Sequence, residues 1–315
     1  MNDLIDAVGR GDIRAIARAI SLVENGDPAA VPLLRALFPR AGAAYLLGIT
    51  GPPGGGKSTL VDRLIAHYRG QGLRVGVIAV DPSSPFSGGA ILGDRVRMQK
   101  HATDPGVFIR SMGSRGHLGG LAAAAADAAT VLDAAGYDRV IFETVGIGQS
   151  EVEVAAQVDT TMLVTVPGLG DDVQVLKAGT MEIADIFAVN KADREGVEKC
   201  VIEIEQLLSV REMDETTWLP PIVQLVARDG TGVDGLADAV ERHRAWLGRN
   251  GRRESKREQR LRQQVRAIIT GRLGEWAQAK LTNDLEAREN LVDLYQRKTD
   301  PHTVAAAVLL ELGIE

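Results

Sequence analysis

Short apolar runs alternate with amphipathic stretches over much of the chain. The run YLLGIT at 45–50 is followed by a glycine-rich segment, an amphipathic stretch and a second run, LRVGVIAVD, at 73–81. Short strands that are apolar on both faces and alternate with helices are typical of a mainly parallel sheet flanked by helices. We therefore expect an α/β fold, with further strands at 107–110, 138–144, 161–167, 185–191 and 220–227 and helices near 118–135 and 172–182.

The beginning of the chain has a helical pattern instead. Apolar side chains recur there at the spacing of one helix face, at Ile13, Ile16, Ile20 and Val23. Asp12 is able to cap the start of this helix, and Asn25 with Gly26 is able to end it. We expect a helical extension over residues 1–42, followed by an α/β domain over residues 43–250.

A basic segment begins where the predicted strands end. Residues 241–262 hold nine basic and three acidic side chains. Such a run could bind phosphate or a membrane surface, but a solvated helix face is the commoner explanation. The ion pairs of that face would join Glu254, Glu258, Arg257 and Arg262, and its buried stripe would be Leu261, Val265, Ile268, Leu273 and Trp276. We expect residues 251–315 to form a helical arm that packs on a partner chain.

The composition limits the classes of function. A net charge of −6 and an aromatic content of 4% argue against nucleic acid as a partner. The single cysteine, Cys200, has no partner for an internal disulfide, and no apolar run reaches the roughly 18 residues that a membrane span needs. These observations predict a cytoplasmic protein that does not enter a membrane.

Glycine makes up 35 of the 315 residues, and part of it lies in a phosphate-binding motif. Residues 51–58, GPPGGGKS, fit the pattern G-x-x-x-x-G-K-[ST] between a predicted strand and a predicted helix. In such a loop, backbone N–H groups and the helix N-terminus surround the phosphates, the lysine reaches the β and γ oxygens, and the serine binds Mg²⁺. The residues expected to hold a nucleoside triphosphate are Gly54, Gly55, Gly56, Lys57, Ser58 and Thr59.

A second motif indicates which base is bound. Asn190, Lys191 and Asp193 follow directly on the predicted strand DIFAV, at the carboxyl end where α/β sheets bind ligands. The carboxylate of Asp193 is able to accept hydrogen bonds from the N1–H and N2–H₂ groups of guanine, which adenine lacks. The motif therefore favours GTP over ATP.

Metal binding requires carboxylates near Ser58. Asp81 and Glu143 each end a predicted strand, so both are expected at the carboxyl edge of the sheet. Glu143 with Gly146 resembles the D-x-x-G element of G proteins, in which the glycine N–H contacts the γ-phosphate. Asp94, in a glycine-rich loop, is a further candidate for Mg²⁺.

One expected side chain is missing from this element. Small GTPases have a glutamine after D-x-x-G that orients the attacking water. This chain has Ile147 there, and Gln149 follows two residues later. We expect slow intrinsic hydrolysis that a partner accelerates.

Several long segments resemble one family. They are GPPGGGKST (51–59), DPSSPFSGGAILGDRVRM (81–98), RSMGSRGHLGGL (110–121), ETVGIGQSEVEV (143–154) and VLKAGTMEIADIFAVNKAD (175–193). They are similar to the MeaB/ArgK family, which includes the human methylmalonic aciduria type A protein. Its members are G-protein chaperones of adenosylcobalamin-dependent acyl-CoA mutases.

The resemblance implies a P-loop GTPase of the SIMIBI class that forms a homodimer through its C-terminal arm. Residues implied in hydrolysis are Lys57, Asp94, Glu143 and Lys177, and those at Mg²⁺ are Ser58, Asp81, Asp94 and Glu143. Gly146, Asn190, Lys191, Asp193 and Ala227 are implied in nucleotide binding together with the phosphate loop. Many members have threonine where this chain has Leu225, so a base contact from that side chain is in doubt.

The implied function is a GTP-dependent helper that protects a mutase of the methylmalonyl-CoA type and controls loading or removal of its cobalamin. The cobalamin adenosyltransferase is a further candidate partner. No D-x-H-x-x-G segment of the kind that ligates cobalamin is present, so this chain is not expected to hold the cofactor alone.

Three alternatives remain open. A metallochaperone GTPase of the same fold would need clustered soft or imidazole ligands, but Cys200 stands alone and the five histidines are scattered. A kinase acting on a transport protein would need an acceptor site beside the γ-phosphate. A structural dimer with a vestigial site would not require the intact motifs around Lys57 and Asp193.

Overall fold

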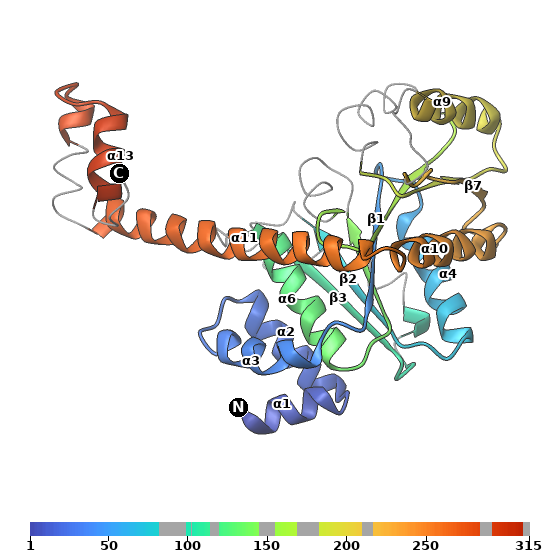
Figure 1. The fold of residues 1–315 in the computed structure, drawn as a ribbon, viewed down its shortest axis with the longest axis horizontal. Coiled ribbons are helices and arrows are strands. Elements are labelled where there is room, and N and C mark those ends of the chain that lie inside the picture. Colours follow the sequence, from blue (N-terminus) through green and yellow to red (C-terminus); the bar gives the residue numbers. More distant parts are fainter. Residues whose placement is uncertain are drawn as a thin grey trace.

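The computed structural model describes residues 1–81, 99–101, 103–113, 120–144, 155–168, 183–209, 217–283 and 292–310. The described strands form one sheet in the order β3-β2-β4-β1-β5-β6-β7, in which every neighbouring pair is parallel (Figure 1). The strands are β1 (Tyr45–Thr50), β2 (Val75–Asp81), β3 (Val107–Gly113), β4 (Arg139–Thr144), β5 (Thr160–Thr165), β6 (Ile186–Asn190) and β7 (Ile222–Leu225). Each strand predicted from the sequence is present, and β3 is three residues longer than expected.

The described helices lie before, between and after these strands. They are α1 (Asn2–Gly9), α2 (Ile13–Glu24), α3 (Ala30–Leu37), α4 (Lys57–Gly70), α6 (Gly120–Ala134), α9 (Val197–Ser209), α10 (Val233–Leu247), α11 (Arg252–Asn283) and α13 (Pro301–Leu310), with short 3₁₀ helices at Phe38–Arg40 and Gln99–His101. The helix predicted near 172–182 lies outside the described residues.

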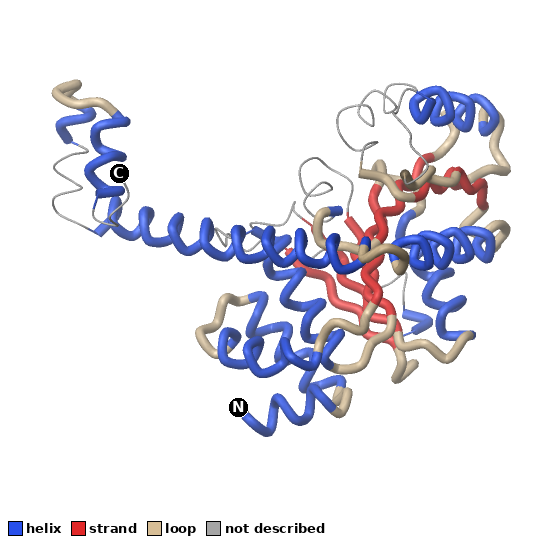
Figure 2. Tube along the Cα trace, viewed as in Figure 1, coloured by secondary structure: helices blue, strands red, loops and turns tan. Residues whose placement is uncertain are grey.

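Two sets of helices cover the two faces of the sheet (Figure 2). On one face, α6 and the N-terminal helices α1 to α3 pack against side chains such as Ile78 and Phe142. On the other face, α4 and α10 pack against side chains such as Ile49 and Val77. Every residue of β1, β4 and β5 is buried, because a central parallel strand is covered on both faces. The predicted α/β architecture is therefore confirmed.

The N-terminal helices share a core with the sheet. The predicted helix is present as α2, and the Asp12 carboxylate caps it by accepting a hydrogen bond from Ala15 N at 2.7 Å. Ile16, Ile20 and Leu33 are fully buried in the same cluster as α6. The N-terminal helices α1 to α3 therefore belong to the same helical layer as α6, on one face of the sheet.

The long helix α11 lies across the body with its first half and then leaves it (Figure 1). Its 32 residues correspond to about 48 Å at 1.5 Å per residue. The predicted buried stripe is wrong for three of its members, since Val265, Ile268 and Leu273 are 56%, 39% and 40% exposed. Beyond its first half this helix leaves the body, and its apolar side is covered only in part by α13, which lines a hollow together with Leu273.

The basic residues at the start of α11 fasten it to the body, which corrects the expectation of a solvated face. Arg260 pairs with the buried carboxylate of Asp159 at 2.9 Å, and Lys256 Nζ donates to the Asp159 carbonyl at 2.6 Å and to Asp185 at 3.2 Å. Arg257 donates to the Gly42 carbonyl at 3.4 Å, so it points toward the body.

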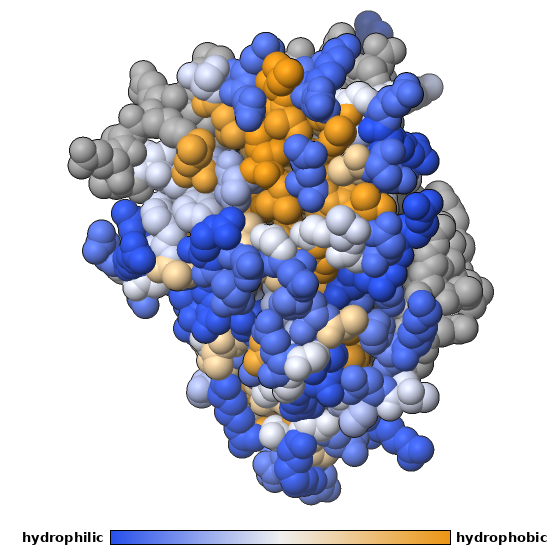
Figure 3. All heavy atoms as spheres, turned by 90° about the vertical axis from the view of Figure 1, so that its right-hand side faces the viewer, coloured by the Kyte–Doolittle hydropathy of each residue, from blue (hydrophilic) through white to orange (hydrophobic). Residues whose placement is uncertain are grey.

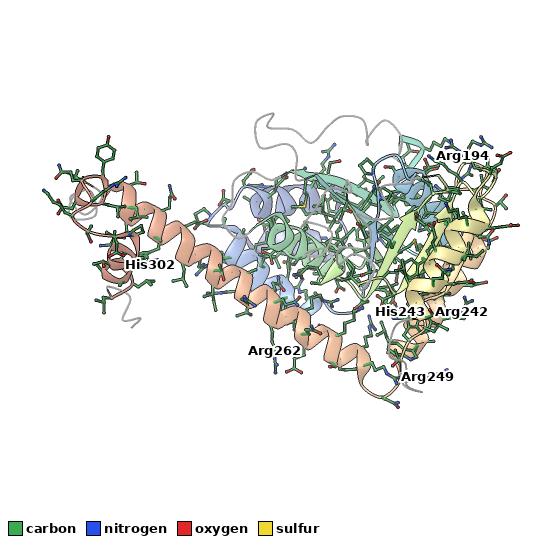
Figure 4. The ribbon with its side chains drawn as sticks, turned by 90° about the horizontal axis from the view of Figure 1, so that it is seen from above. Arg194, Arg242, His243, Arg249, Arg262 and His302 are labelled. Carbon is green, nitrogen blue, oxygen red and sulfur yellow. The ribbon has the colours of Figure 1, made fainter. Side chains whose placement is uncertain are left out.

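One of the ion pairs expected on the outer face of α11 is confirmed. Arg262 contacts Glu258 at 2.7 Å, and both side chains are mostly exposed. Arg262 points away from the body, whereas His243 lies inside it (Figure 4). The basic run therefore contains residues that bind the body, such as Lys256 and Arg260, and residues that face solvent, such as Arg262.

One surface of the body carries apolar side chains. The face at which α9 and β7 lie in Figure 1 shows a gathering of hydrophobic residues (Figure 3). In these elements and the segment before β7, Ile202 is 51% and Leu219 is 57% exposed. None of the helices among the described residues combines the length and apolarity that crossing a membrane requires.

Candidate functional site

The glycine-rich loop joins β1 to α4 and has a backbone that only glycine tolerates. Gly51 has φ 137°, and a Cβ there would lie 2.0 Å from the Val164 carbonyl oxygen. Gly56 has φ 88°, and a Cβ would lie 2.3 Å from Asn190 Nδ2. Both conformations are in the left-handed region that other residues avoid. The loop is therefore a tight cradle of backbone groups at the N-terminus of α4, the arrangement that binds phosphate.

Two lysines close over this loop. Lys57 is only 6% exposed, and its Nζ donates to the carbonyls of Gly51 at 2.7 Å and Pro52 at 2.9 Å. Lys191 approaches from the end of β6, with Nζ donating to the Gly54 carbonyl at 2.8 Å and with φ 58°. The Lys57 ammonium group is thus held where phosphate oxygens would replace the two carbonyls as acceptors, and Lys191 ties the guanine motif to the loop.

The strand order brings Glu143 to the phosphate loop. Glu143 lies near the end of β4, which is the parallel neighbour of β1, and Ser58 Oγ donates to its carboxylate at 2.5 Å. The Thr144 hydroxyl donates to Thr50 Oγ1 at 2.9 Å and ties the ends of the two strands together. A hydroxyl and a carboxylate are the hard oxygen donors that Mg²⁺ prefers. The residues at this junction therefore fit the metal.

Asn190 connects the phosphate loop to the base-binding segments. Its side chain is 3% exposed, and Nδ2 donates to the Gly55 carbonyl at 2.8 Å. Its Oδ1 accepts hydrogen bonds from the backbone N–H groups of Lys191 at 2.8 Å and Ala227 at 3.0 Å. The N–H of Ala227, which was expected to serve the nucleotide, is here used to hold Asn190.

The carboxylate expected to read guanine is accessible at this edge of the sheet. Asp193 is 44% exposed and pairs with Arg228 at 3.5 Å. Leu225 is 1% exposed and belongs to the core, so its side chain makes no contact with a base. The sequence motifs did not identify Arg228, since it is near Asp193 only through the pairing of β6 with β7.

A second arginine was also missed. Arg63 of α4 donates through Nε to the Ala227 carbonyl at 3.0 Å and through its terminal nitrogen to the Arg228 carbonyl. It lies outside the phosphate-loop motif, and its partners are more than 160 residues away in the sequence. Only the packing of α4 beside the loop after β7 reveals the contact.

A hollow of about 480 Å³ lies at the phosphate loop. Its lining includes the phosphate loop, Glu143, Thr144 and Lys191. The structure places six of the predicted site residues around this hollow: Gly54, Gly56, Lys57, Ser58, Thr59 and Glu143. Asp94, Gly146 and Lys177 lie outside the described residues, and for Asp81 the backbone at the end of β2 is described but the side chain is not.

A parallel sheet with a phosphate loop after β1, an acid at the end of the adjacent β4 and an Asn-Lys-Ala-Asp segment after β6 defines a P-loop GTPase of the SIMIBI class. The chain belongs to the MeaB family: a family model described as methylmalonyl Co-A mutase-associated GTPase MeaB matches residues 16–282. The resemblance recognised from the sequence motifs is confirmed.

Individual relatives extend this match over nearly the whole chain. A protein of Pyrococcus abyssi named as a GTPase is 49% identical over 314 residues, which cover 99% of this chain and 97% of the relative. GTPase ArgK of Escherichia coli is 37% identical over 92% of this chain and 87% of its own length. The crystal structure of a LAO/AO transport system kinase superposes with a TM-score of 0.74 at 28% identity, covering 99% of this chain and 97% of that one.

Proposed function

We propose that this GTPase is the helper of an adenosylcobalamin-dependent acyl-CoA mutase of the methylmalonyl-CoA type, which it protects and whose cobalamin loading or removal it controls. The name of the matching family model supports the choice of client. The contact between Ser58 and Glu143 carries the mechanism. It joins the phosphate loop to Glu143, the first residue of the element that resembles D-x-x-G of G proteins.

The site residues have separate tasks in this proposal. When GTP binds, Lys57 Nζ exchanges the carbonyls of Gly51 and Pro52 for the β and γ oxygens, where it stabilises the charge that develops during phosphoryl transfer. Ser58 and Glu143 would hold Mg²⁺, which would supply positive charge that neutralises the phosphate oxygens. The Asp193 carboxylate leaves its ion pair with Arg228 and accepts hydrogen bonds from the N1–H and N2–H₂ groups of guanine.

Several features of the proposal go beyond the site. We infer that hydrolysis is slow until the partner binds, because Ile147 has no group to orient water.

The chain acts in the cytoplasm, with residues 1–42 as an extension, 43–250 as the G domain and 251–315 as the arm. It does not bind cobalamin alone. Asp81, Asp94, Gly146 and Lys177 complete the nucleotide site, and the adenosyltransferase is a further candidate partner.

The arm supports a homodimer in this proposal. The end of α11 and α13 enclose an apolar hollow of about 360 Å³ whose lining includes Leu273, Trp276 and Val304. Val265 and Ile268 of the same helix are also exposed, and a second copy would remove apolar surface of the arm from water. Sedimentation equilibrium of the full chain and of a Leu273→Glu variant tests this, and an unchanged monomeric mass for both would contradict it.

Hydrolysis assays with the client test the function. We expect methylmalonyl-CoA mutase to raise the GTPase rate of the wild type, and the complex to survive gel filtration with a non-hydrolysable GTP analogue. Ser58→Ala lowers kcat by about 100-fold, the effect typical of losing a group that stabilises transition-state charge. Ser209→Ala is the matched control, because its hydroxyl contacts only the Gln206 carbonyl among the described residues. Fast hydrolysis by the isolated chain, unaffected by any mutase, would contradict the proposal.

A second candidate is phosphoryl transfer to a transport protein. The name of the superposed LAO/AO transport system kinase favours it. Incubation with γ-labelled GTP separates the two functions. A GTPase releases free phosphate, whereas a kinase leaves the label on the acceptor protein.

A further inference from the structure

The two contacts of Arg63 link the helix that carries the phosphate ligands to the loop between β7 and α10. Lys57 and Ser58 are the first residues of α4, and Arg63 lies in its second turn. Its guanidinium donates to two successive carbonyls, those of Ala227 at 3.0 Å and of Arg228. Two donors in a planar fork bind two adjacent acceptors in one orientation only. Arg63 therefore fixes a direction as well as a distance.

The orientation of these carbonyls decides where the neighbouring N–H groups point. The described chain has no cis peptide bonds, and in a trans peptide the C=O of one residue and the N–H of the next point in opposite directions. Because the Ala227 carbonyl faces α4, the Arg228 N–H faces away from α4. The rest of the loop is closed on itself by hydrogen bonds such as Val226 N to the Thr231 carbonyl at 2.9 Å.

The same short segment contacts two residues of the guanine motif. Ala227 N–H donates to Asn190 Oδ1 at 3.0 Å, and the Arg228 side chain pairs with Asp193 at 3.5 Å. Rotation of the peptide between Ala227 and Arg228 would redirect the Arg228 N–H, which lies in that peptide together with the Ala227 carbonyl. Arg63 is the described side chain that holds this peptide from the opposite side.

We propose that Arg63 is a positioning residue for base selection: it holds the peptides after Ala227 and Arg228 so that the loop presents the Arg228 N–H to the carbonyl oxygen of guanine and leaves Asp193 aligned with the base edge. The inference rests on the proposed use of guanine nucleotides. It adds a determinant of base choice on the helix that otherwise serves the phosphates. Adenine carries an amino group where guanine has this oxygen, so a misplaced N–H costs guanine affinity and leaves adenine affinity unchanged.

The experiment measures base selectivity and not affinity alone. GDP, ADP and inorganic pyrophosphate, each with Mg²⁺, are titrated into the full chain by isothermal calorimetry. For Arg63→Met we expect GDP affinity to fall about tenfold, as for the loss of a charge-assisted hydrogen bond, with ADP and pyrophosphate affinities retained. Arg63→Lys keeps one donor and recovers part of the GDP over ADP ratio.

Arg69→Met is the matched control on the same helix. Arg69 also donates to a backbone carbonyl, that of Leu73 at 2.7 Å, and to Asp104 at 2.8 Å. It makes none of the contacts described for the base-binding loop, so its loss lowers the melting temperature without changing the GDP over ADP ratio.

The outcomes separate the inference from the function on which it rests. A GDP over ADP ratio that stays at the wild-type value in both Arg63 variants overturns the inference and leaves Arg63 a structural tie. An equal loss of GDP, ADP and pyrophosphate affinity does the same. A wild-type protein that binds ADP as tightly as GDP overturns the proposed function itself. If Arg63→Met does not fold, the ratio measured for Arg63→Lys decides.

Discussion

The body and the arm of this protein use their apolar residues in opposite ways. In the body, the central strands are buried on both faces, and side chains such as Phe142 and Ile49 have no exposure. In the arm, Val265 and Ile268 are 56% and 39% exposed although they recur at the spacing of a helix stripe. The body is therefore stabilised by its own chain, whereas the arm presents a surface suited to another one.

The joint between the two regions is charged. Arg260 and Lys256 of α11 bind the carboxylates of Asp159 and Asp185, which precede β5 and β6. At its opposite end, β6 finishes with Asn190, the first residue of the proposed guanine motif. Although the sequence of α11 is amphipathic, ion pairs attach its first turns to the body, and part of its apolar side stays exposed.

The largest expected effect is on the free energy of unfolding, when a buried apolar residue of the body and an exposed one of the arm are each replaced by alanine. Phe142→Ala opens a cavity in the sheet core and should lower the free energy of unfolding by about 3–5 kcal/mol. Ile268→Ala in the arm should lower it by less than about 1 kcal/mol in dilute protein. Urea unfolding followed by circular dichroism measures both. Equal losses in the two variants would show that the arm is buried within its own chain.

The joint should give the next largest effect. Arg260→Ala leaves the Asp159 carboxylate, whose side chain is 2% exposed, without this cation, and should destabilise the fold by about 2–4 kcal/mol. Arg262→Ala, two residues further on, removes an exposed pair and should cost less than about 0.5 kcal/mol. Thermal melts of the two variants make the comparison. A small loss for Arg260→Ala would mean that the root of α11 is held by other contacts.

Asp127 of α6 makes a further contact between body and arm, and it titrates. Gln264 Nε2 donates to its carboxylate at 2.8 Å, and burial raises the pKa of Asp127 to about 6. The folded protein thus binds the proton more tightly than the unfolded chain, so the stability from this group is present at low pH and is lost as pH rises through 6. At pH 7 the free energy of unfolding of Asp127→Asn should therefore be about 1–2 kcal/mol higher than that of the wild type.

The same two proteins compared at pH 4 provide the control for Asp127. The wild-type carboxyl is then protonated in the folded state, so the advantage of the asparagine variant should disappear. An advantage that stays constant between pH 4 and pH 7 would assign it to packing instead of charge.

The smallest effect concerns His243, which lies beneath the joint. Burial lowers the pKa of His243 to about 4, while Asp185 and Asp159 oppose the shift and Lys256 adds to it. The unfolded chain thus takes up the proton first, so stability is complete above pH 6.5 and falls as pH decreases toward 4. Between pH 7 and pH 5.5 the wild type should lose about 1 kcal/mol more than His243→Asn. Parallel pH dependences of the two unfolding free energies would contradict this.

Local patterns in the sequence were sufficient for much of the fold. Two-sided apolar runs located the strands, and the Asp12 cap located α2, because periodicity and capping depend on neighbours within a few residues. The phosphate loop could also be predicted from the sequence, because its motif has glycine at Gly51 and Gly56, where the backbone adopts positive φ angles. The expectation for the stripe of α11 failed because periodicity reports which residues share a face and not what covers that face.

The sequence by itself determined the elements, the cradle of the phosphate loop and the residue types proposed to bind guanine and Mg²⁺, since each is encoded in a short stretch of chain. The tertiary structure decided which of them meet. Ser58 and Glu143 are 85 residues apart and come together because β4 pairs with β1. Arg63 reaches Ala227 across 164 residues because α4 packs beside the loop after β7. Such contacts follow from strand order and helix packing, which no local pattern contains.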